Sequence, residues 1–362
     1  MSQLVLAPRR SQRSNMAKVT VVICLSVSLA GCALPVSTRT KPVTSTAATP
    51  ALLTPVPMKA TPIDESGPGA QGNWFVWERF NHTKGRANYW AQRNGGRWIR
   101  INAKGTLGHD GDVGPGRVLY SQARYRRYRE LPTDLWQYNL STGHRLRLPG
   151  PVNTRAYESL PSVSGRYLLF QRLVRPDPYA VAARKVMLFD RRAQVLTTLA
   201  VAHQQPRDDY APVVEAGQLN GGYATWRRVA WTEQGVSDGS FYDAPQSEVA
   251  LYDVETGTTT RYRLRPSTYL STTAVSSGGT LYYIRYGINA SRTGDETRTR
   301  NYFMKRPLGG TPEVIAKMPR CFEIRDLYVD DRSDGSHRLY FTVWTHRGAD
   351  IYKITDPPPT AN

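Results

Sequence analysis

Gly165-Arg166-Tyr167-Leu168-Leu169-Phe170 decides the fold, because the chain repeats the pattern of this stretch six times. In each copy a glycine precedes a short run of apolar and aromatic residues, and turn-forming residues flank the run. Short runs rich in β-formers are typical of buried strands. The glycines that open the copies are spaced 44, 49, 57, 57 and 56 residues apart; they are Gly72, Gly116, Gly165, Gly222, Gly279 and Gly335.

A second strand-like segment follows these runs and enters a tight turn, most clearly at residues 135–143 and 250–257. Asn139 and Asp253 enter these turns, where such side chains bond their own backbone, and glycine accepts a positive φ on the way out. The sequence has no helical periodicity of any length. Repeats of roughly 40 to 50 residues, each a small antiparallel sheet, predict a β-propeller. We therefore expect an all-β, six-bladed β-propeller, with a sandwich or barrel as the alternative.

The sequence leaves the closure of this ring open. Beyond residues 350–354 the chain reaches Pro357-Pro358-Pro359, and no fourth strand for the last blade is obvious there. The N-terminal side offers a candidate around residues 56–63. Its prolines are tolerated only at the edge of a sheet.

The N-terminal segment predicts export and lipidation. Four basic residues and an apolar run over residues 19–31 precede Cys32, in the order Leu29-Ala30-Gly31-Cys32. This arrangement is typical of a secretory signal peptide, and the run is shorter than the about 20 residues of a transmembrane helix. It resembles a bacterial lipoprotein signal, which implies a lipid on Cys32 and a protein on the extracytoplasmic face of the cell membrane. An ordinary signal peptide with a coincidental Cys32 is the alternative.

Charge and cysteine content fit this location. The net charge is +19, and removal of residues 1–31, with four basic residues and no acids, leaves +15 (19 − 4). Outside the cytoplasm the matching anions are lipid headgroups and anionic envelope polymers, so we expect no nucleic acid partner. General solubility is the alternative reason for the charge. Cys24 leaves with the signal peptide and Cys32 takes lipid, so Cys321 has no partner for a disulfide.

Composition divides the chain into four parts. Residues 1–31 form the signal peptide, and residues 32–71, rich in Pro, Thr and Ser, are expected to be a disordered tether. Aromatic residues then begin at Trp74. We place the propeller at residues 72–356 and a short tail at residues 357–362.

The third blade carries a family resemblance. Pro161-Ser162-Val163-Ser164-Gly165, followed by the apolar run and by Leu188-Phe189-Asp190, is similar to the TolB-like six-bladed propellers. The usual Pro-Asp-Gly tripeptide of that family occurs in none of the blades of this chain. The resemblance covers roughly residues 72–356 and implies protein partners at a face of the propeller.

Two motifs with catalytic or metal-binding patterns are interpreted as loops. Gly235-Val236-Ser237-Asp238-Gly239 matches a nucleophile elbow, but that elbow needs a following helix, and Phe241 and Pro245 follow instead. His109-Asp110-Gly111-Asp112 and residues 330–335 offer oxygen atoms that suit Ca²⁺, without the spacing of an EF-hand loop. We interpret both acidic segments as turns and expect no metal and no cofactor.

The basic run Arg124-Tyr125-Arg126-Arg127-Tyr128-Arg129 is the candidate binding surface. Interleaved tyrosines and arginines stack on rings and clamp phosphate or carboxylate groups. On a single strand, Arg124, Arg126 and Tyr128 would share one face. A solvated loop in the second blade is the alternative.

These observations predict a monomeric binding or scaffold propeller without catalytic residues. It would be tethered through Cys32 and engage an envelope protein or an anionic envelope polymer. The alternative is an envelope enzyme, a lyase or hydrolase with its site at the propeller channel. That alternative needs carboxylates or histidines that converge from the inner parts of several blades, and the sequence does not display such a set.

Overall fold

The computed structural model describes residues 52–59, 61, 63–126, 129–130, 132–174, 183–203, 212–235, 241–290, 296–298, 300–319, 321–345 and 348–358. These residues belong to one compact unit, residues 50–362. Residues 1–49 form a second unit outside the described residues, and the predicted signal peptide and Cys32 lie there. Within the described part of the chain, no helix has the length and apolar character needed to cross a membrane.

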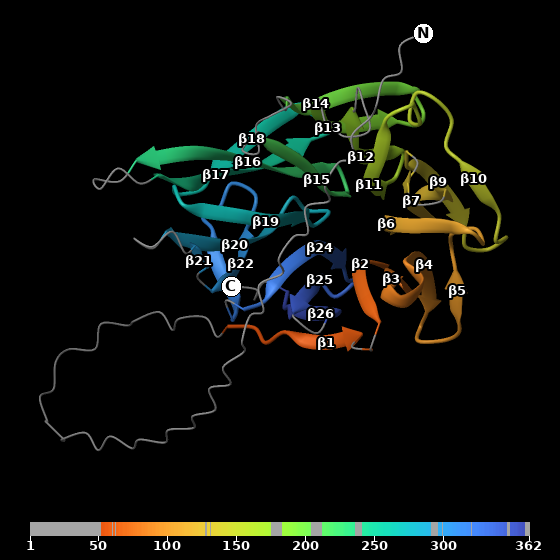
Figure 1. Ribbon diagram of the computed structural model, residues 1–362, viewed down its shortest axis with the longest axis horizontal. Coiled ribbons are helices and arrows are strands. Elements are labelled where there is room, and N and C mark those ends of the chain that lie inside the picture. Colours follow the sequence, from red (N-terminus) through yellow and green to blue (C-terminus); the bar gives the residue numbers. More distant parts are fainter. Residues whose placement is uncertain are drawn as a thin grey trace, which may run out of the picture. The chain divides into compact units, whose positions relative to one another are not determined.

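The described unit is a six-bladed β-propeller, as predicted (Figure 1). Each blade is a four-stranded antiparallel sheet. The short strands β8 (Arg129–Glu130) and β21 (Glu296–Arg298) pair additionally with the second strands of blades 2 and 5. One 3-10 helix, His82–Lys84, follows the second strand of blade 1.

The strands of the first three blades run from the channel outward in chain order. Blade 1 contains β2 (Asp64–Gln71), β3 (Trp74–Asn81), β4 (Arg86–Arg93) and β5 (Trp98–Arg100). Blade 2 contains β6 (Thr106–Gly114), β7 (Arg117–Arg126), β9 (Asp134–Asn139) and β10 (Arg145–Arg147). Blade 3 contains β11 (Tyr157–Ser164), β12 (Tyr167–Val174), β13 (Ala183–Asp190) and β14 (Val195–His203).

The last three blades follow the same order, except that the N-terminus supplies one strand of blade 6. Blade 4 contains β15 (Val213–Asn220), β16 (Tyr223–Gly235), β17 (Phe241–Asp253) and β18 (Thr258–Arg263). Blade 5 contains β19 (Thr268–Val275), β20 (Leu281–Ala290), β22 (Asn301–Arg306) and β23 (Glu313–Met318). Blade 6 contains β24 (Glu323–Asp331), β25 (His337–Thr345), β26 (Gly348–Asp356) and β1 (Val56–Lys59).

The repeated apolar run forms the second strand of each blade, and the preceding glycine lies in the turn from the first strand. Gly72 and Gly165 adopt φ values of 58° and 56°, which favour glycine. In blade 4 the residue with positive φ is Gly221, one position before the predicted Gly222. The first, innermost strand of each blade therefore precedes the repeat that the sequence displays.

Strand β1 closes the ring beside β26 (Figure 1). Val56 and Pro57 lie opposite Lys353 and Tyr352, so the predicted strand from the N-terminal side and the edge position of its proline are confirmed. Lys59 Nζ lies 4.9 and 5.0 Å from the ring centroids of Trp77 and Trp98 in blade 1. The closing strand thus connects blade 6 to blade 1.

The propeller begins earlier than the predicted boundary at residue 72. The amide of Leu53 donates to the carbonyl oxygen of Ile315 in β23 at 2.7 Å, and β1 and β2 both precede Gly72. The expected tether, residues 32–71, therefore includes two strands at its C-terminal end. The sequence predicts the boundary too late because this stretch has few aromatic residues. Strand β2 is built instead from small and polar residues, and it pairs with β3.

Apolar side chains fill the spaces between neighbouring blades. The largest cluster joins blades 5 and 6, where the ring centroids of Phe303 and Phe341 are 4.6 Å apart. The six inner strands contact one another in sequence around the channel, and β2 contacts β24 to complete the circle. Residues from distant parts of the chain consequently meet at the centre.

Candidate functional site

A polar cavity lies where the inner strands begin, and we call it the channel mouth. It consists of two adjoining hollows of about 400 and 320 Å³, which share Asp110, Ser159, Arg325 and Asp326. The larger hollow is lined on one side by residues of blades 1, 2 and 6, including Glu78, His109 and Trp344. The smaller hollow is lined by residues of blades 4 and 5, including Glu215, Arg227, Tyr269 and Tyr286.

Bulges in the inner strands position the shared carboxyl groups. The register of every inner strand shifts once, and Asp110 and Asp326 lie at two of these shifts with φ values of 31° and 55°. Residues other than glycine rarely adopt such φ values, and β-bulges redirect side chains next to functional sites. The strained backbone therefore places both carboxyl groups in the channel wall.

Burial and neighbouring carboxylates raise the pKa of both groups. Asp110 is partly accessible to water, but the surrounding protein raises its pKa to about 7, and the charge of Glu78 adds to this effect. Burial is also the main cause of the raised pKa of Asp326, with Glu78 and Glu215 contributing. A group whose pKa is perturbed by burial and by charged neighbours in a cavity marks a candidate site.

The basic side chains at the mouth have acidic partners. His109 Nδ1 lies 3.3 Å from Glu78 Oε1, Arg227 forms two bonds of 2.9 and 3.2 Å to Glu215, and Arg325 pairs with Glu323 at 2.6 Å. The same side chains act on the central carboxyl groups: His109 lowers the pKa of Asp110, and the charge of Asp326 raises the pKa of Arg325. Asp326 also accepts the amide of Gly67 at 3.3 Å. Burial nevertheless keeps the pKa of both carboxyl groups above its ordinary value.

Aromatic rings flank the carboxyl groups. Tyr269 and Tyr286 stack with their centroids 5.0 Å apart, and the guanidinium of Arg227 lies 5.6 Å from the ring of Tyr269. On the other side, Arg325 lies 5.5 Å from the ring of Trp344. The mouth therefore combines apolar ring faces with hydrogen-bond acceptors, as small ligand sites do.

Hydrogen bonds cross the channel below the mouth. Gln218 of blade 4 reaches across to Val329 of blade 6, with bonds of 2.7 and 2.9 Å to its carbonyl and amide. Asp112 accepts from Ser162 Oγ at 2.7 Å and from the amide of Val163 at 2.8 Å. A small cavity of about 80 Å³ is lined by Asp112, Ser162 and Gln218 and also by Asp110 and Asp326, so it adjoins the mouth.

The interpretation of residues 109–112 as a turn is wrong, because they lie on strand β6. The sequence repeat does not include strand β6, and the glycines and carboxylates of this strand are equally typical of a turn. In residues 330–335 the turn interpretation holds for Asp334, whose carboxylate accepts from the amide and hydroxyl of Ser336 at 2.9 and 2.6 Å. The described residues contain no group of three or more His, Cys, Asp or Glu side chains placed to hold a metal ion.

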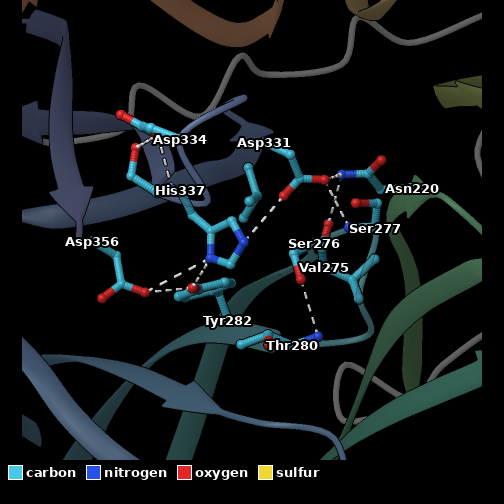
Figure 2. Close-up of polar contacts among 12 residues, drawn as sticks. Asn220, Val275, Ser276, Ser277, Thr280, Tyr282, Asp331, Asp334, His337 and Asp356 are labelled. Atoms are coloured by element: carbon cyan, nitrogen blue, oxygen red, sulfur yellow. Dashed lines mark hydrogen bonds and ion pairs between the residues drawn. The ribbon is translucent and has the colours of Figure 1, made fainter. Parts of the chain in front are cut away.

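A second polar network joins blades 4, 5 and 6, at the ends of the strands opposite to the channel mouth (Figure 2). Tyr282 Oη donates to Asp356 at 2.5 Å and lies 2.6 Å from His337 Nδ1. The other ring nitrogen of His337 faces Asp331 at 3.4 Å, and Asp331 also accepts from Asn220 at 2.9 Å. These groups contact one another, so we interpret the network as a structural connection between the blades.

The predicted basic run lies partly outside the described residues. Arg124 and Arg126 end strand β7 and Arg129 begins β8, with Arg126 opposite Arg129 in a hairpin. Arg127 and Tyr128 lie outside the described residues, as do the side chains of the other three. The backbone thus places the run in a hairpin, and the shared face of Arg124, Arg126 and Tyr128 stays a prediction.

The nucleophile-elbow pattern joins two strands. Strand β16 ends at Gly235 and β17 begins at Phe241, directly opposite in the same sheet. Ser237 itself lies outside the described residues. The strand that follows stands where the elbow requires a helix, which agrees with the interpretation as a loop of blade 4.

Comparison with known proteins finds chains of similar structure at low sequence identity. No protein-family model and no curated protein sequence matches this chain. The propeller domain of the trilobed protease from Pyrococcus furiosus is 12% identical, with a TM-score of 0.46 and 82% of each chain covered. An ulvan lyase of family PL25 is 9% identical, with a TM-score of 0.46 and 81% and 86% of the two chains covered. The α-L-arabinanase of Penicillium chrysogenum is 10% identical, with a TM-score of 0.46 and 85% and 99% covered. Such similarity concerns the fold and carries no argument about activity.

The Asp110→Asn variant tests the electrostatics of the mouth, and asparagine tolerates the positive φ at this position. Because folding raises the pKa of Asp110 from 3.8 to about 7, the folded protein binds more protons than the unfolded chain between these values. Its stability therefore falls as pH rises through this range. We expect the variant to exceed the wild type by roughly 1–3 kcal/mol at about pH 8, and to equal it near pH 4. Urea unfolding at both pH values measures this, with Glu255→Gln as control; a pH-independent difference would contradict the account.

Proposed function

We propose that this protein is a lipid-anchored, extracytoplasmic binding propeller whose channel mouth holds a positively charged segment of an envelope protein. The convergence of carboxyl groups from several blades on one cavity, with Asp110 and Asp326 at its centre, carries the proposal. A cation bound there would favour the ionised forms of both groups and relieve the repulsion among the carboxylates. The flanking rings of Trp344 and Tyr269 would hold the rest of the segment.

Charge also discriminates between the two expected partner classes. Five carboxyl groups from four blades lie at the mouth, and they would repel an anionic envelope polymer; they are Glu78, Asp110, Glu215, Glu323 and Asp326. The hollows of about 400 and 320 Å³ suit side chains or a short extended segment. A protein partner is therefore favoured at the mouth, while an anionic polymer would fit the basic run at residues 124–129.

The location rests on the N-terminal sequence. The lipoprotein-like signal ends at Cys32, and the two acyl chains of a diacylglyceryl group suffice for stable anchoring. The resemblance of blade 3 to TolB-like propellers supports a protein partner at a propeller face, although fold analogy alone does not determine function. Residues from Cys32 to the first described residue, Leu52, would link the propeller to the membrane.

An enzyme with its site at the channel is the second candidate. The specific observation in its favour is the pKa of about 7 at Asp110 beside other carboxyl groups. A carboxyl group that keeps its proton near neutral pH, next to ionised ones, is the arrangement used for general acid–base catalysis. Such an envelope lyase or hydrolase would convert its ligand, whereas the binding proposal requires no turnover.

Pull-down from detergent-solubilised envelopes tests the binding proposal. We expect Asp110→Asn/Asp326→Asn to lose the partner that the wild type retains, because it removes the charge of the two central carboxyl groups. The control Glu255→Gln/Glu313→Gln removes the same charge on outer strands and turns, and should retain the partner.

A third variant separates the two candidate surfaces. We expect Arg124→Ala/Arg126→Ala/Arg127→Ala/Arg129→Ala to retain the protein partner. If the channel variant retained the protein partner and the arginine variant lost it, the binding site would lie at the basic run and the proposal would be overturned. Cleavage of the captured partner by the wild type, but not by Asp110→Asn, would favour the enzyme.

The Cys32→Ser variant tests the anchor. Without the thiol no lipid can be attached, so we expect the protein to leave the membrane fraction or to be mislocalised. Fractionation followed by immunoblotting measures the distribution, with Cys321→Ser as the matched control. A Cys32→Ser protein that still fractionates with membranes would show that the anchor assignment is wrong.

A further inference from the structure

A groove of about 550 Å³ lies between blades 2 and 3, at the ends of the strands opposite to the channel mouth. Its floor belongs to the apolar cluster that these two blades share, and consists of Leu148, Val152, Leu168 and Phe189. Leu146 stands at the rim with 50% of its surface exposed. The floor side chains are nearly fully buried, so the exposed apolar side chain of the groove is Leu146. The volume of the groove lies in the range of ligand sites, roughly 300–1,000 Å³.

Arginines surround this apolar floor. Arg117, Arg166, Arg191 and Arg192 line the groove. Arg166 pairs with Asp190 at 3.2 Å, and Arg191 donates to the neutral Oε1 of Gln137 at 3.2 Å. Among the described residues, neither Arg117 nor Arg191 pairs with a carboxylate.

Arg117 and Arg191 also act on each other. Both are partly buried. Burial lowers the pKa of Arg191, and the positive charge of Arg117 lowers it further. Two like charges held together at an apolar surface are unfavourable until an anion lies between them. Guanidinium groups bind carboxylate and phosphate oxygens in pairs of parallel hydrogen bonds.

We propose that this groove binds a single-chain anionic amphiphile, with its carboxylate or phosphate head on Arg117 and Arg191 and its aliphatic chain along the apolar floor. The two arginines complement the charge of the head group, and the apolar side chains of Leu148 and Phe189 complement the aliphatic chain of the ligand. A free inorganic anion would leave the apolar side of the groove, with Leu146 at its rim, uncovered. The groove and the channel mouth lie at opposite ends of the strands, so this inference is independent of the proposed function.

Isothermal titration calorimetry with dodecyl phosphate, below its micelle concentration, tests the proposal. We expect the Arg117→Gln/Arg191→Gln variant to bind at least about 10-fold more weakly than the wild type, because it loses charge-assisted bonds to the head. The control Arg93→Gln/Lys104→Gln removes the same charge at exposed positions of blade 1 and the loop after it. It should bind within about 2-fold of the wild type. Thermal unfolding of each variant confirms that it is folded.

Two further titrations separate the head from the chain. Inorganic phosphate and dodecyltrimethylammonium should each bind the wild type at least about 10-fold more weakly than dodecyl phosphate. Equal binding of inorganic phosphate, or of the cationic amphiphile, would overturn the proposal. Binding to vesicles of anionic phospholipid without binding of monomeric dodecyl phosphate would also overturn it, and would indicate adsorption to a membrane surface instead.

Discussion

Closure of the ring by β1 is the constraint on which the rest of the structure depends. Asp110 and Asp326 belong to blades 2 and 6, and blade 1 between them is joined to blade 6 by the closing strand. The cation–π contacts of Lys59 with Trp77 and Trp98 stabilise the junction between these two blades. Without closure the inner strands β2 and β24 would separate, and the carboxyl groups would no longer meet. Nonlocal pairing therefore creates the channel mouth.

The second strands were predictable from sequence, and the inner strands were not. Residues 165–170 combine a turn glycine with a buried apolar run, so local chemistry and tertiary structure agree there. Strand β2 contains Gly67, Pro68 and Gly69, which indicate a loop when they are met as sequence. The ring imposes this composition, because the inner strands crowd together: a Cβ at Gly217 of β15 would lie 2.6 Å from the carbonyl oxygen of Thr273 in the neighbouring inner strand β19.

The candidate site was hidden for the same reason. Asp110 stands in an acidic segment that is typical of a turn, and Asp326 and Glu215 carry no local signal. Their proximity follows from the circle of inner strands, which no single segment encodes. Distance from the repeat glycines gives one sequence signal for the bulges of the inner strands. Gly67, Asp110 and Leu160 lie five or six residues before Gly72, Gly116 and Gly165, and all three have a positive φ.

Charge is segregated in this molecule: a strongly basic chain carries an acidic cavity at its channel. This contrast underlies the proposed preference for a cationic segment, and it requires that burial holds the central carboxyl groups at a raised pKa. The most direct measurement is the titration of the Asp110 side chain by NMR of carboxyl carbons, assigned with the Asp110→Asn variant. The account predicts a pKa near 7 in the free protein. A pKa close to the ordinary value of 3.8 would contradict it.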